Sequence, residues 1–388
     1  MAAGIAASDG VTAQGVQGAV RANGAVFLGC GIATACWAPM VPMARERLAI
    51  GDGTLGLILL ALGAGGMLMM PLSGLLVRRF GSRHVVVLAG LSPMLLLPLL
   101  AIAPTALTLA LALFLFGALI GALDVSMNAQ AVTIESAAER SRMATFHGLF
   151  SLGGLIGAGL MSLLIGLGLP LVTIAALCGT AITLMVLAGR RRLLSDPPSA
   201  AGSAGFSWPR GAVVLLGVLC LIAFLAEGAV LDWSAVFLRY SRDASPALAG
   251  MGYGLFSLTM AVGRLNGDRL IRRFGPVPVL RYGALLAALG YGVALLAPWP
   301  PAALGGFMLV GLGLSNLVPV LFSAAGRVPD MSPGLAISAV STLGYAGLLA
   351  GPAVLGLVSE LTSLALALAL IAVALLGVMA SAGRVVRR

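Results

Sequence analysis

The sequence predicts an all-α integral membrane protein in which twelve transmembrane helices form two pseudo-symmetric six-helix bundles. Only 9% of the 388 residues are charged and 60% are hydrophobic, whereas about 25% of the residues of an ordinary soluble domain are charged. Twelve apolar runs are long enough to cross a bilayer, for which a helix needs about 20 residues. The sequence also matches itself at a shift of 194 residues, half its length. This composition excludes a soluble enzyme.

Each apolar run is expected to be a helix. Backbone polar groups in lipid must be paired within a helix or a closed barrel, and the runs lack the alternation of barrel strands. The first 21 residues have no basic start and do not resemble a signal peptide, so the first run is a span. The runs lie at about residues 22–44, 54–77, 84–103, 105–131, 143–166, 168–189, 211–238, 247–271, 277–298, 300–325, 333–358 and 361–383.

The internal repeat predicts how these spans are grouped. The shift superposes Arg78-Arg79-Phe80-Gly81 on Arg272-Arg273-Phe274-Gly275 without a gap, and several glycines coincide as well. Fixed-period self-similarity is typical of a duplicated structural unit. We expect an N-terminal tail at 1–21, a six-helix bundle at 22–189, a linker at 190–210 and a second bundle with a short basic tail at 211–388.

The arginines predict the orientation. The chain contains no lysine, so all 23 basic residues are arginines. If the N-terminus is cytoplasmic, the outer side holds only Arg45, Arg47, Arg239 and Arg242. Such a bias in short loops places both termini in the cytoplasm. The net charge of +10 is then an orientation signal, and no nucleic-acid partner is expected.

The chain resembles the major facilitator superfamily. Two parallel six-helix repeats are the arrangement of those transporters, and the segment from Gly74 to His84 is similar to their loop signature G-x-x-x-D-R-x-G-R-R. The resemblance implies a multi-pass transporter of a bacterial inner membrane that works as a monomer by alternating access. On the matching positions it implies gating or structural roles for Arg79, Gly81 and Arg273.

The chain departs from this signature where an acid is expected, since Arg78 and Arg272 occupy those positions. In the second half, Arg264 and Asp268 stand one helical turn apart ahead of Arg272. Because residues at i and i+4 are neighbours on a helix, we expect Arg264 and Asp268 to form a structural ladder that replaces the missing acid.

Asp124 is the strongest candidate for chemistry. Ionisable residues inside spans are costly and are functional candidates by default. Gly117, Gly121, Asp124 and Asn128 share one face of the fourth span, where glycines allow a neighbouring helix to approach closely. The sequence Asp124-Val-Ser-Met-Asn128 resembles an element of fucose-permease-like facilitators whose acid serves proton-coupled uptake. We expect Asp124 to carry protons and Asn128 to bind substrate; the alternative is a structural acid.

Three further polar residues in the spans have two interpretations each. His147 lies at the same depth as Asn128 and can meet it, as a proton shuttle or as a structural histidine. Glu227 is expected to serve both proton coupling and substrate binding, whereas Asp232 lies five residues further, near the outer interface. Arg264 can bind an anionic substrate or pair with Asp268.

The resemblance also places the first, fourth, seventh and tenth helices around a central cavity. It therefore implies Trp37 and Asn316 as substrate contacts. The four cysteines lie inside apolar runs without metal-ligand spacing, so neither a metal site nor a disulfide framework is expected, and no cofactor is implied.

The predicted function is secondary active transport of a small polar solute, coupled to protons through Asp124. A proton-driven exporter of drugs or metabolites and an uncoupled facilitator are alternatives within the same fold. A membrane sensor that binds without flux is an alternative of another class. No phosphate-binding loop or nucleophilic triad is present, so the chain is not expected to be an enzyme.

Overall fold

The computed structural model describes residues 13–138, 142–195, 211–325, 327–328 and 333–385. These residues form helices and no strand, and twelve helical segments among them are long and apolar enough to cross a membrane. The predicted all-α class with twelve spans is confirmed. The helices are α1 (Ala13–Leu48), α2 (Asp52–Phe80), α3 (Ser82–Ala89), α4 (Ser92–Ile102), α5 (Ala106–Ala138), α6 (Met143–Gly166), α7 (Leu171–Gly189), α8 (Ala212–Ser241), α9 (Pro246–Phe274), α10 (Pro276–Leu296), α11 (Pro300–Leu314), α12 (Leu317–Ala325), α13 (Pro333–Leu361) and α14 (Leu364–Val385).

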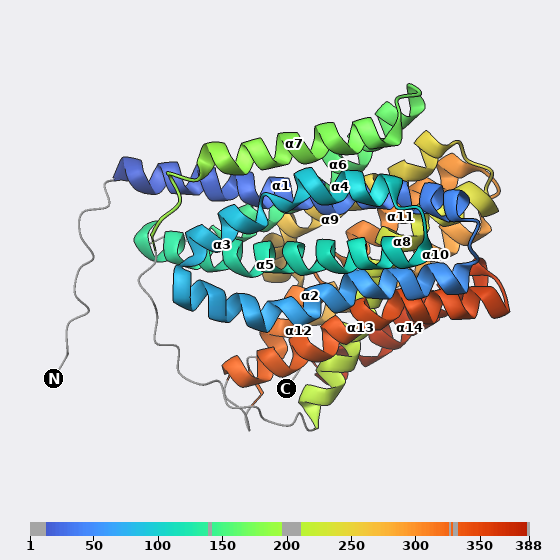
Figure 1. Cartoon of the computed structure of the whole chain (residues 1–388). Coiled ribbons are helices and arrows are strands. Elements are labelled where there is room, and N and C mark those ends of the chain that lie inside the picture. Colours follow the sequence, from blue (N-terminus) through green and yellow to red (C-terminus); the bar gives the residue numbers. More distant parts are fainter. Residues whose placement is uncertain (1–12, 139–141, 196–210, 326, 329–332, 386–388) are drawn as a thin grey trace.

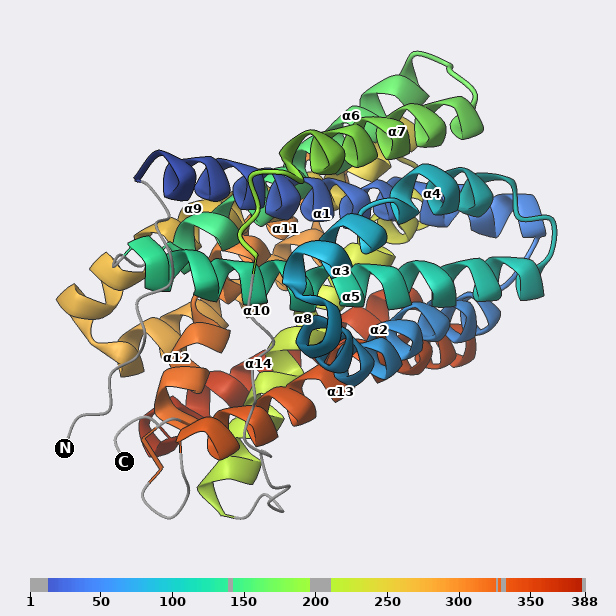
Figure 2. The ribbon, with the colours of Figure 1, turned by 60° about the vertical axis from the view of Figure 1, so that its left-hand side comes forward.

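The helices run side by side in one bundle, and the described chain begins and ends at the same end of it (Figures 1 and 2). We call the end where α1 begins and α14 ends the terminal end, and the other the opposite end. The first helix starts at Ala13, before the predicted start at residue 22, because the segment from Gln14 to Arg21 is helical but too polar for a hydropathy signal. Residues 196–210 of the predicted linker lie outside the described residues.

Two spans are interrupted. The third consists of α3 and α4, with a break at Gly90, where a side chain would collide with Val186 of α7. The Gly90 carbonyl accepts a hydrogen bond from Thr183 Oγ1 at 3.1 Å. The tenth consists of α11 and α12, with a break at Ser315 and Asn316. In both spans a side chain of a neighbouring helix or of the break itself satisfies a backbone group that the interruption leaves free.

Helix packing repeats between the two halves of the chain. In the first half α1 packs on α6, α2 on α5 and α4 on α7; in the second half α8 packs on α13, α9 on α11 and α10 on α14. The closest contacts use glycines that the repeat superposes. A Cβ on Gly117 would collide with the Leu62 carbonyl, and a Cβ on Gly311 would collide with the Phe256 carbonyl. All four positions are related by the shift of 194 residues, so the repeat preserves backbone contacts as well as spans.

The halves meet along two main seams. The helix α2 packs on α13, and α6 packs on α9, while α1 also contacts α8 and α9. Near the opposite end the first seam is tight, because a Cβ on Gly56 would lie 2.5 Å from the Pro352 carbonyl oxygen. The polar residues of the spans gather beside these seams.

Candidate functional site

A group of polar side chains lies inside the bundle where the two halves meet. We call it the central polar cluster; its members are Asp124 and Asn128 of α5, His147 and Ser151 of α6, Glu227 of α8, Arg264 of α9 and Tyr345 of α13. Three of these helices belong to the second half of the chain and two to the first. The cluster therefore spans the boundary that must rearrange if the halves move against each other.

Arg264 connects the halves within this cluster. Its Nη2 lies 3.5 Å from Glu227 Oε2, and its Nη1 donates to Ser151 Oγ at 3.5 Å. The side chains of Arg264 and Glu227 are each 23% exposed, so both charges are partly removed from solvent. His147 is close enough to Arg264 for their charges to interact.

The expected ladder between Arg264 and Asp268 is not formed in this structure. Asp268 is exposed toward the terminal end, whereas the Arg264 side chain turns to Glu227 on the neighbouring helix. A partly desolvated guanidinium gains more from a carboxylate that also lacks water than from one that water already solvates. The missing acid of the loop signature is therefore not replaced by this pair.

Asp124 is held on its own helix. Asn128 Nδ2 donates to the Asp124 carbonyl at 2.8 Å and to Asp124 Oδ1 at 3.2 Å. Tyr345 of the other half lies within range of electrostatic interaction with both Asp124 and Glu227. Gly121 on the same face lies against Gly66 of α2, as the expected close approach requires.

The expected meeting of His147 and Asn128 does not occur in this conformation. The Asn128 amide is bound to Asp124, and the His147 ring packs edge-on against Phe27 with 5.4 Å between ring centres. Matching depth in two helices does not fix which way the side chains point, and here His147 lies toward α1 and Arg264.

The two substrate contacts implied by the tenth and first helices do not join the cluster. Trp37 is 1% exposed, in the hydrophobic core. Asn316 is 7% exposed, and its Nδ2 donates to the Gly263 carbonyl at 3.0 Å and to Ser315 Oγ at 2.9 Å. In this conformation Asn316 joins the break of the tenth span to α9.

The residues of the loop signature form the same turn in both halves. Gly81 and Gly275 end α2 and α9 with φ of 80° and 83°, a conformation that favours glycine. Their N–H groups donate to the Val77 and Ile271 carbonyls, each at 2.8 Å. The guanidinium of Arg79 lies over the Phe80 ring and that of Arg273 over the Phe274 ring, each at 5.3 Å.

The sequence analysis assigned no role to Tyr345 or Ser151. Both are polar positions in apolar spans, which is a detectable signal. The expectation that the first, fourth, seventh and tenth helices line the cavity gave little weight to α6 and α13. The packing of α6 on α9 and of α13 on α8 brings these two side chains to the cluster.

At the opposite end the halves are joined by ionic and polar contacts, which we call the clasp. Arg45 Nη2 lies 3.0 Å from Asp52 Oδ1, and Arg239 Nε lies 3.2 Å from Glu46 Oε1. Ser359 donates to Asp52 Oδ2 at 2.5 Å. The Arg45 guanidinium also stands 4.2 Å from the centre of the Tyr240 ring. The contacts of Arg239 with Glu46 and of Asp52 with Ser359 cross the boundary between the halves.

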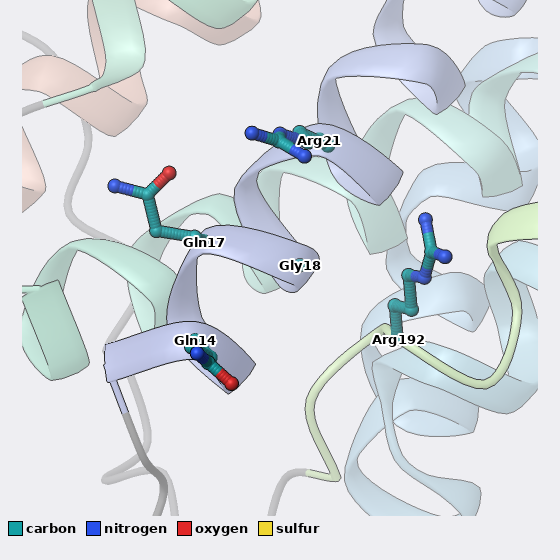
Figure 3. Close-up of a pocket in the computed structure, with 5 residues that line it drawn as sticks. All are labelled: Gln14, Gln17, Gly18, Arg21 and Arg192. Atoms are coloured by element: carbon teal, nitrogen blue, oxygen red, sulfur yellow. The ribbon is translucent and has the colours of Figure 1, made fainter.

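A separate pocket of about 570 Å³ lies at the terminal end. Gln14, Gln17, Gly18 and Arg21 of α1 line it, and Arg192 faces α1 across it (Figure 3). It lies at the start of α1 and shares no residue with the central polar cluster. The transport residues predicted from sequence are therefore not found in this pocket.

Comparison with known proteins agrees with the architecture. The family model of the Major Facilitator Superfamily matches residues 24–238. The chain is 46% identical over 373 residues to an uncharacterized MFS-type transporter of Yersinia pestis, covering 96% of this chain and 97% of the relative. It is 33% identical to the membrane protein MosC of Rhizobium meliloti, covering 87% and 83% of the two chains.

Among solved structures, a mutant of the nucleoside transporter NupG superposes with a TM-score of 0.75 at 13% identity. The match covers 94% of this chain and 99% of that one, and at this identity it shows the fold alone. The family's members are membrane transporters and not enzymes. The repeat, the twelve spans and these matches together show that the chain belongs to the Major Facilitator Superfamily.

Proposed function

We propose that this protein is a proton-coupled transporter of a small polar solute in a bacterial inner membrane, with both termini in the cytoplasm. The observation that carries the proposal is the position of Asp124. It is a half-buried carboxyl inside a span, it accepts a hydrogen bond from Asn128, and it lies beside Tyr345 of the other half. Among the described residues no ion pair compensates its charge, so protonation removes a charge that is costly to bury.

The members of the central polar cluster take distinct roles in this proposal. Asp124 binds and releases the proton as water reaches it from alternate sides. Glu227 is held by Arg264 in the present conformation and becomes available to solute or proton when that pair opens. His147 serves as a relay near Arg264, and Asn128 contacts the solute. Trp37 and Asn316 reach the solute only after the halves have rearranged, and the protein acts as a monomer.

The arginines at the opposite end support the proposed orientation. All four arginines that oppose the bias have structural contacts there. Arg45 and Arg239 belong to the clasp, while Arg47 and Arg242 bind carbonyls at the ends of α4 and α10. Because these four arginines make structural contacts, their presence on the outer side does not weaken the charge bias that supports cytoplasmic termini.

The test uses the full chain in liposomes. A metabolite library is first screened for solutes that raise the melting temperature, and uptake of a stabilising solute is then measured with and without an imposed pH gradient. We expect gradient-driven accumulation in the wild type and equilibration without accumulation in Asp124→Asn. Asp268→Asn, at an exposed site outside the cluster, is the matched control.

Undiminished gradient-driven accumulation in Asp124→Asn contradicts the proposal. The same assay separates the other candidate functions. Flux that a pH gradient does not change indicates a facilitator, and flux driven only in the outward direction indicates an exporter. Saturable binding without any flux indicates a sensor.

A further inference from the structure

Asp232 of α8 is the most deeply buried charged residue in the described part of the chain. It is 3% exposed, and every other buried side chain among the described residues is uncharged. It lies about two turns from the clasp residue Arg239, which at 1.5 Å per residue is about 10 Å along the helix. The sequence alone placed Asp232 near the interface, where water would solvate it; the structure instead places it in the core.

The surroundings of Asp232 leave several buried polar atoms without partners. Among the described residues, no hydrogen-bond partner is found for Asp232 Oδ1, Trp233 Nε1 or Ser234 Oγ of α8, or for Trp37 Nε1 of α1. These groups lie at a similar depth. Pro39 of α1 and Ser234 both lie against the stretch of α9 from Gly250 to Gly252. Buried polar groups are normally satisfied, so four such atoms at one level of α1 and α8 indicate groups that find partners in another conformation.

No cation faces Asp232 from the helices packed around α8. On α9 the nearest titratable group is Tyr253, within electrostatic range of Asp232, Glu227 and Arg264. On α1 the charged groups at this end are Arg45 and Glu46, which are engaged in the clasp, and Arg47, which binds carbonyls at the end of α4. Arg21 of α1 is at the terminal end.

The remaining neighbours of α8 add no cation near Asp232. On α13, Glu360 is at the opposite end and Tyr345 is in the central cluster, while Arg384 of α14 is at the terminal end. The helices α11 and α12 carry no charged residue. Arg239, on α8 itself, is bound to Glu46.

A carboxylate removed from water without a cation or a hydrogen-bond donor is strongly disfavoured, whereas the neutral acid is compatible with a packed site. We propose that Asp232 is a second proton-binding site of the transporter, occupied while α1 and α8 are closed over it and emptied when the clasp opens. This inference rests on the proposed function, because alternating access supplies the opening. On opening, the O–H bond of the Asp232 carboxyl breaks and its proton passes to water, which leaves a hydrated carboxylate.

The proposal makes the clasp a control on protonation. The pair of Glu46 with Arg239 and the contact of Arg45 with Tyr240 close the opposite end beyond Asp232. Water can reach Asp232 from that end only when α1 and α8 separate. Asp124 lies in the central cluster, so the two carboxyls exchange protons through different openings.

Infrared spectroscopy of the full chain in vesicles of phosphatidylethanolamine and phosphatidylglycerol tests this directly, because protonated carboxyl groups have their own C=O stretching band. At neutral pH we expect a component of this band in the wild type that Asp232→Asn loses and that Asp124→Asn retains. Asp243→Asn, at an exposed residue of the loop after α8, is the matched control and leaves the component unchanged. A wild-type spectrum in Asp232→Asn overturns the proposal.

A second measurement tests the proposal even if Asp232→Asn does not fold. In Glu46→Gln, which weakens the clasp but keeps Asp232, we expect the band component to fall at neutral pH and its exchange with deuterium to accelerate. An unchanged band in a protein whose opposite end has opened overturns the gating by the clasp. The spectra report on Asp232 without any solute. Undiminished gradient-driven accumulation in Asp124→Asn would therefore contradict the proposed function and leave this inference standing, whereas a wild-type spectrum in Asp232→Asn would overturn this inference and leave the role of Asp124 standing.

Discussion

At the scale of single residues, Arg264 has two acidic neighbours and binds one. Asp268 follows it by one turn but is exposed, whereas Glu227 lies on α8 inside the bundle, with its oxygen 3.5 Å from the guanidinium. Exposed ion pairs contribute little because water competes for both charges. The partner of a long side chain therefore depends on which neighbouring groups are shielded from water. The spacing of residues along one helix does not give this information.

A double-mutant cycle tests this choice. We expect Arg264→Gln and Glu227→Gln to be coupled by about 1 kcal/mol in the free energy of unfolding, as is typical of partly exposed pairs. The measurement is chemical unfolding in mixed micelles. In the matched cycle Arg264→Gln is combined with Asp268→Asn, and we expect their effects on the free energy of unfolding to be additive. Coupling of Arg264 to Asp268 without coupling to Glu227 would show that Asp268 is the partner instead.

At the scale of elements, the two halves use the same devices at equivalent positions. Arg47 at the end of α1 donates to the carbonyls of Leu100, Ala101 and Ala103 at the end of α4. Arg242 after α8 donates to those of Ala294 and Leu295 at the end of α10. The last carbonyls of a helix have no partner within it, and a guanidinium can bind several at once. Two of the arginines at the opposite end thus cap the third and ninth spans.

Replacing a capping arginine by lysine tests whether the geometry of the guanidinium matters. We expect Arg47→Lys to lower the free energy of unfolding by about 1–3 kcal/mol, because an ammonium cannot reproduce the fork that binds three carbonyls. Thermal melting of the purified protein measures the change. Arg269→Lys, at an exposed position on α9, is the control; equal stability of the two variants would show that charge alone matters at Arg47.

The repeated glycines make a second prediction at this scale. We expect Gly117→Ala and Gly311→Ala each to cost about 1–3 kcal/mol of stability, because the added methyl group collides with a neighbouring backbone carbonyl. Gly159→Ala and Gly292→Ala are matched controls, since a Cβ there meets nothing within 4 Å, and these should be neutral or stabilising. Melting temperatures of the four variants separate packing from helix propensity; a uniform effect would contradict the packing argument.

Much of the fold could be predicted from the sequence, because hydropathy and the repeat act at the scale of whole spans. The breaks at Gly90 and Ser315 could not, since both segments remain apolar through the break. Scarcity of charge was enough to find Asp124, Glu227 and Arg264. It did not reveal that Asn128 binds Asp124 instead of meeting His147, or that Asp232 is buried, because rotamers and burial depend on the packing of helices distant in sequence.

At the scale of the whole molecule, the halves are held together at the opposite end by a clasp of partly exposed pairs. Arg239 and Glu46 are 34% and 45% exposed, and Arg45 and Asp52 are 24% and 16% exposed. Pairs this exposed are weak and screened by salt. A weak clasp suits alternating access, because its ionic contacts can open without a large energetic cost.

Weakening the clasp should therefore shift the population of conformations. Nitroxide labels on Thr105→Cys and Trp299→Cys, which the repeat relates and which lie on opposite halves, report the distance across this end. The four native cysteines are buried, so labelling is directed to the introduced ones.

We expect the double variant Glu46→Gln, Asp52→Asn to add a population at longer label-to-label distance in double electron–electron resonance measurements, because the ionic contacts that close this end are lost. Raised ionic strength should shift the wild type in the same direction, while Asp268→Asn at the terminal end leaves the distribution unchanged. A single unaltered distance in the clasp variant at every salt concentration would mean that the apolar packing of α1, α2, α8 and α13 alone holds this end closed.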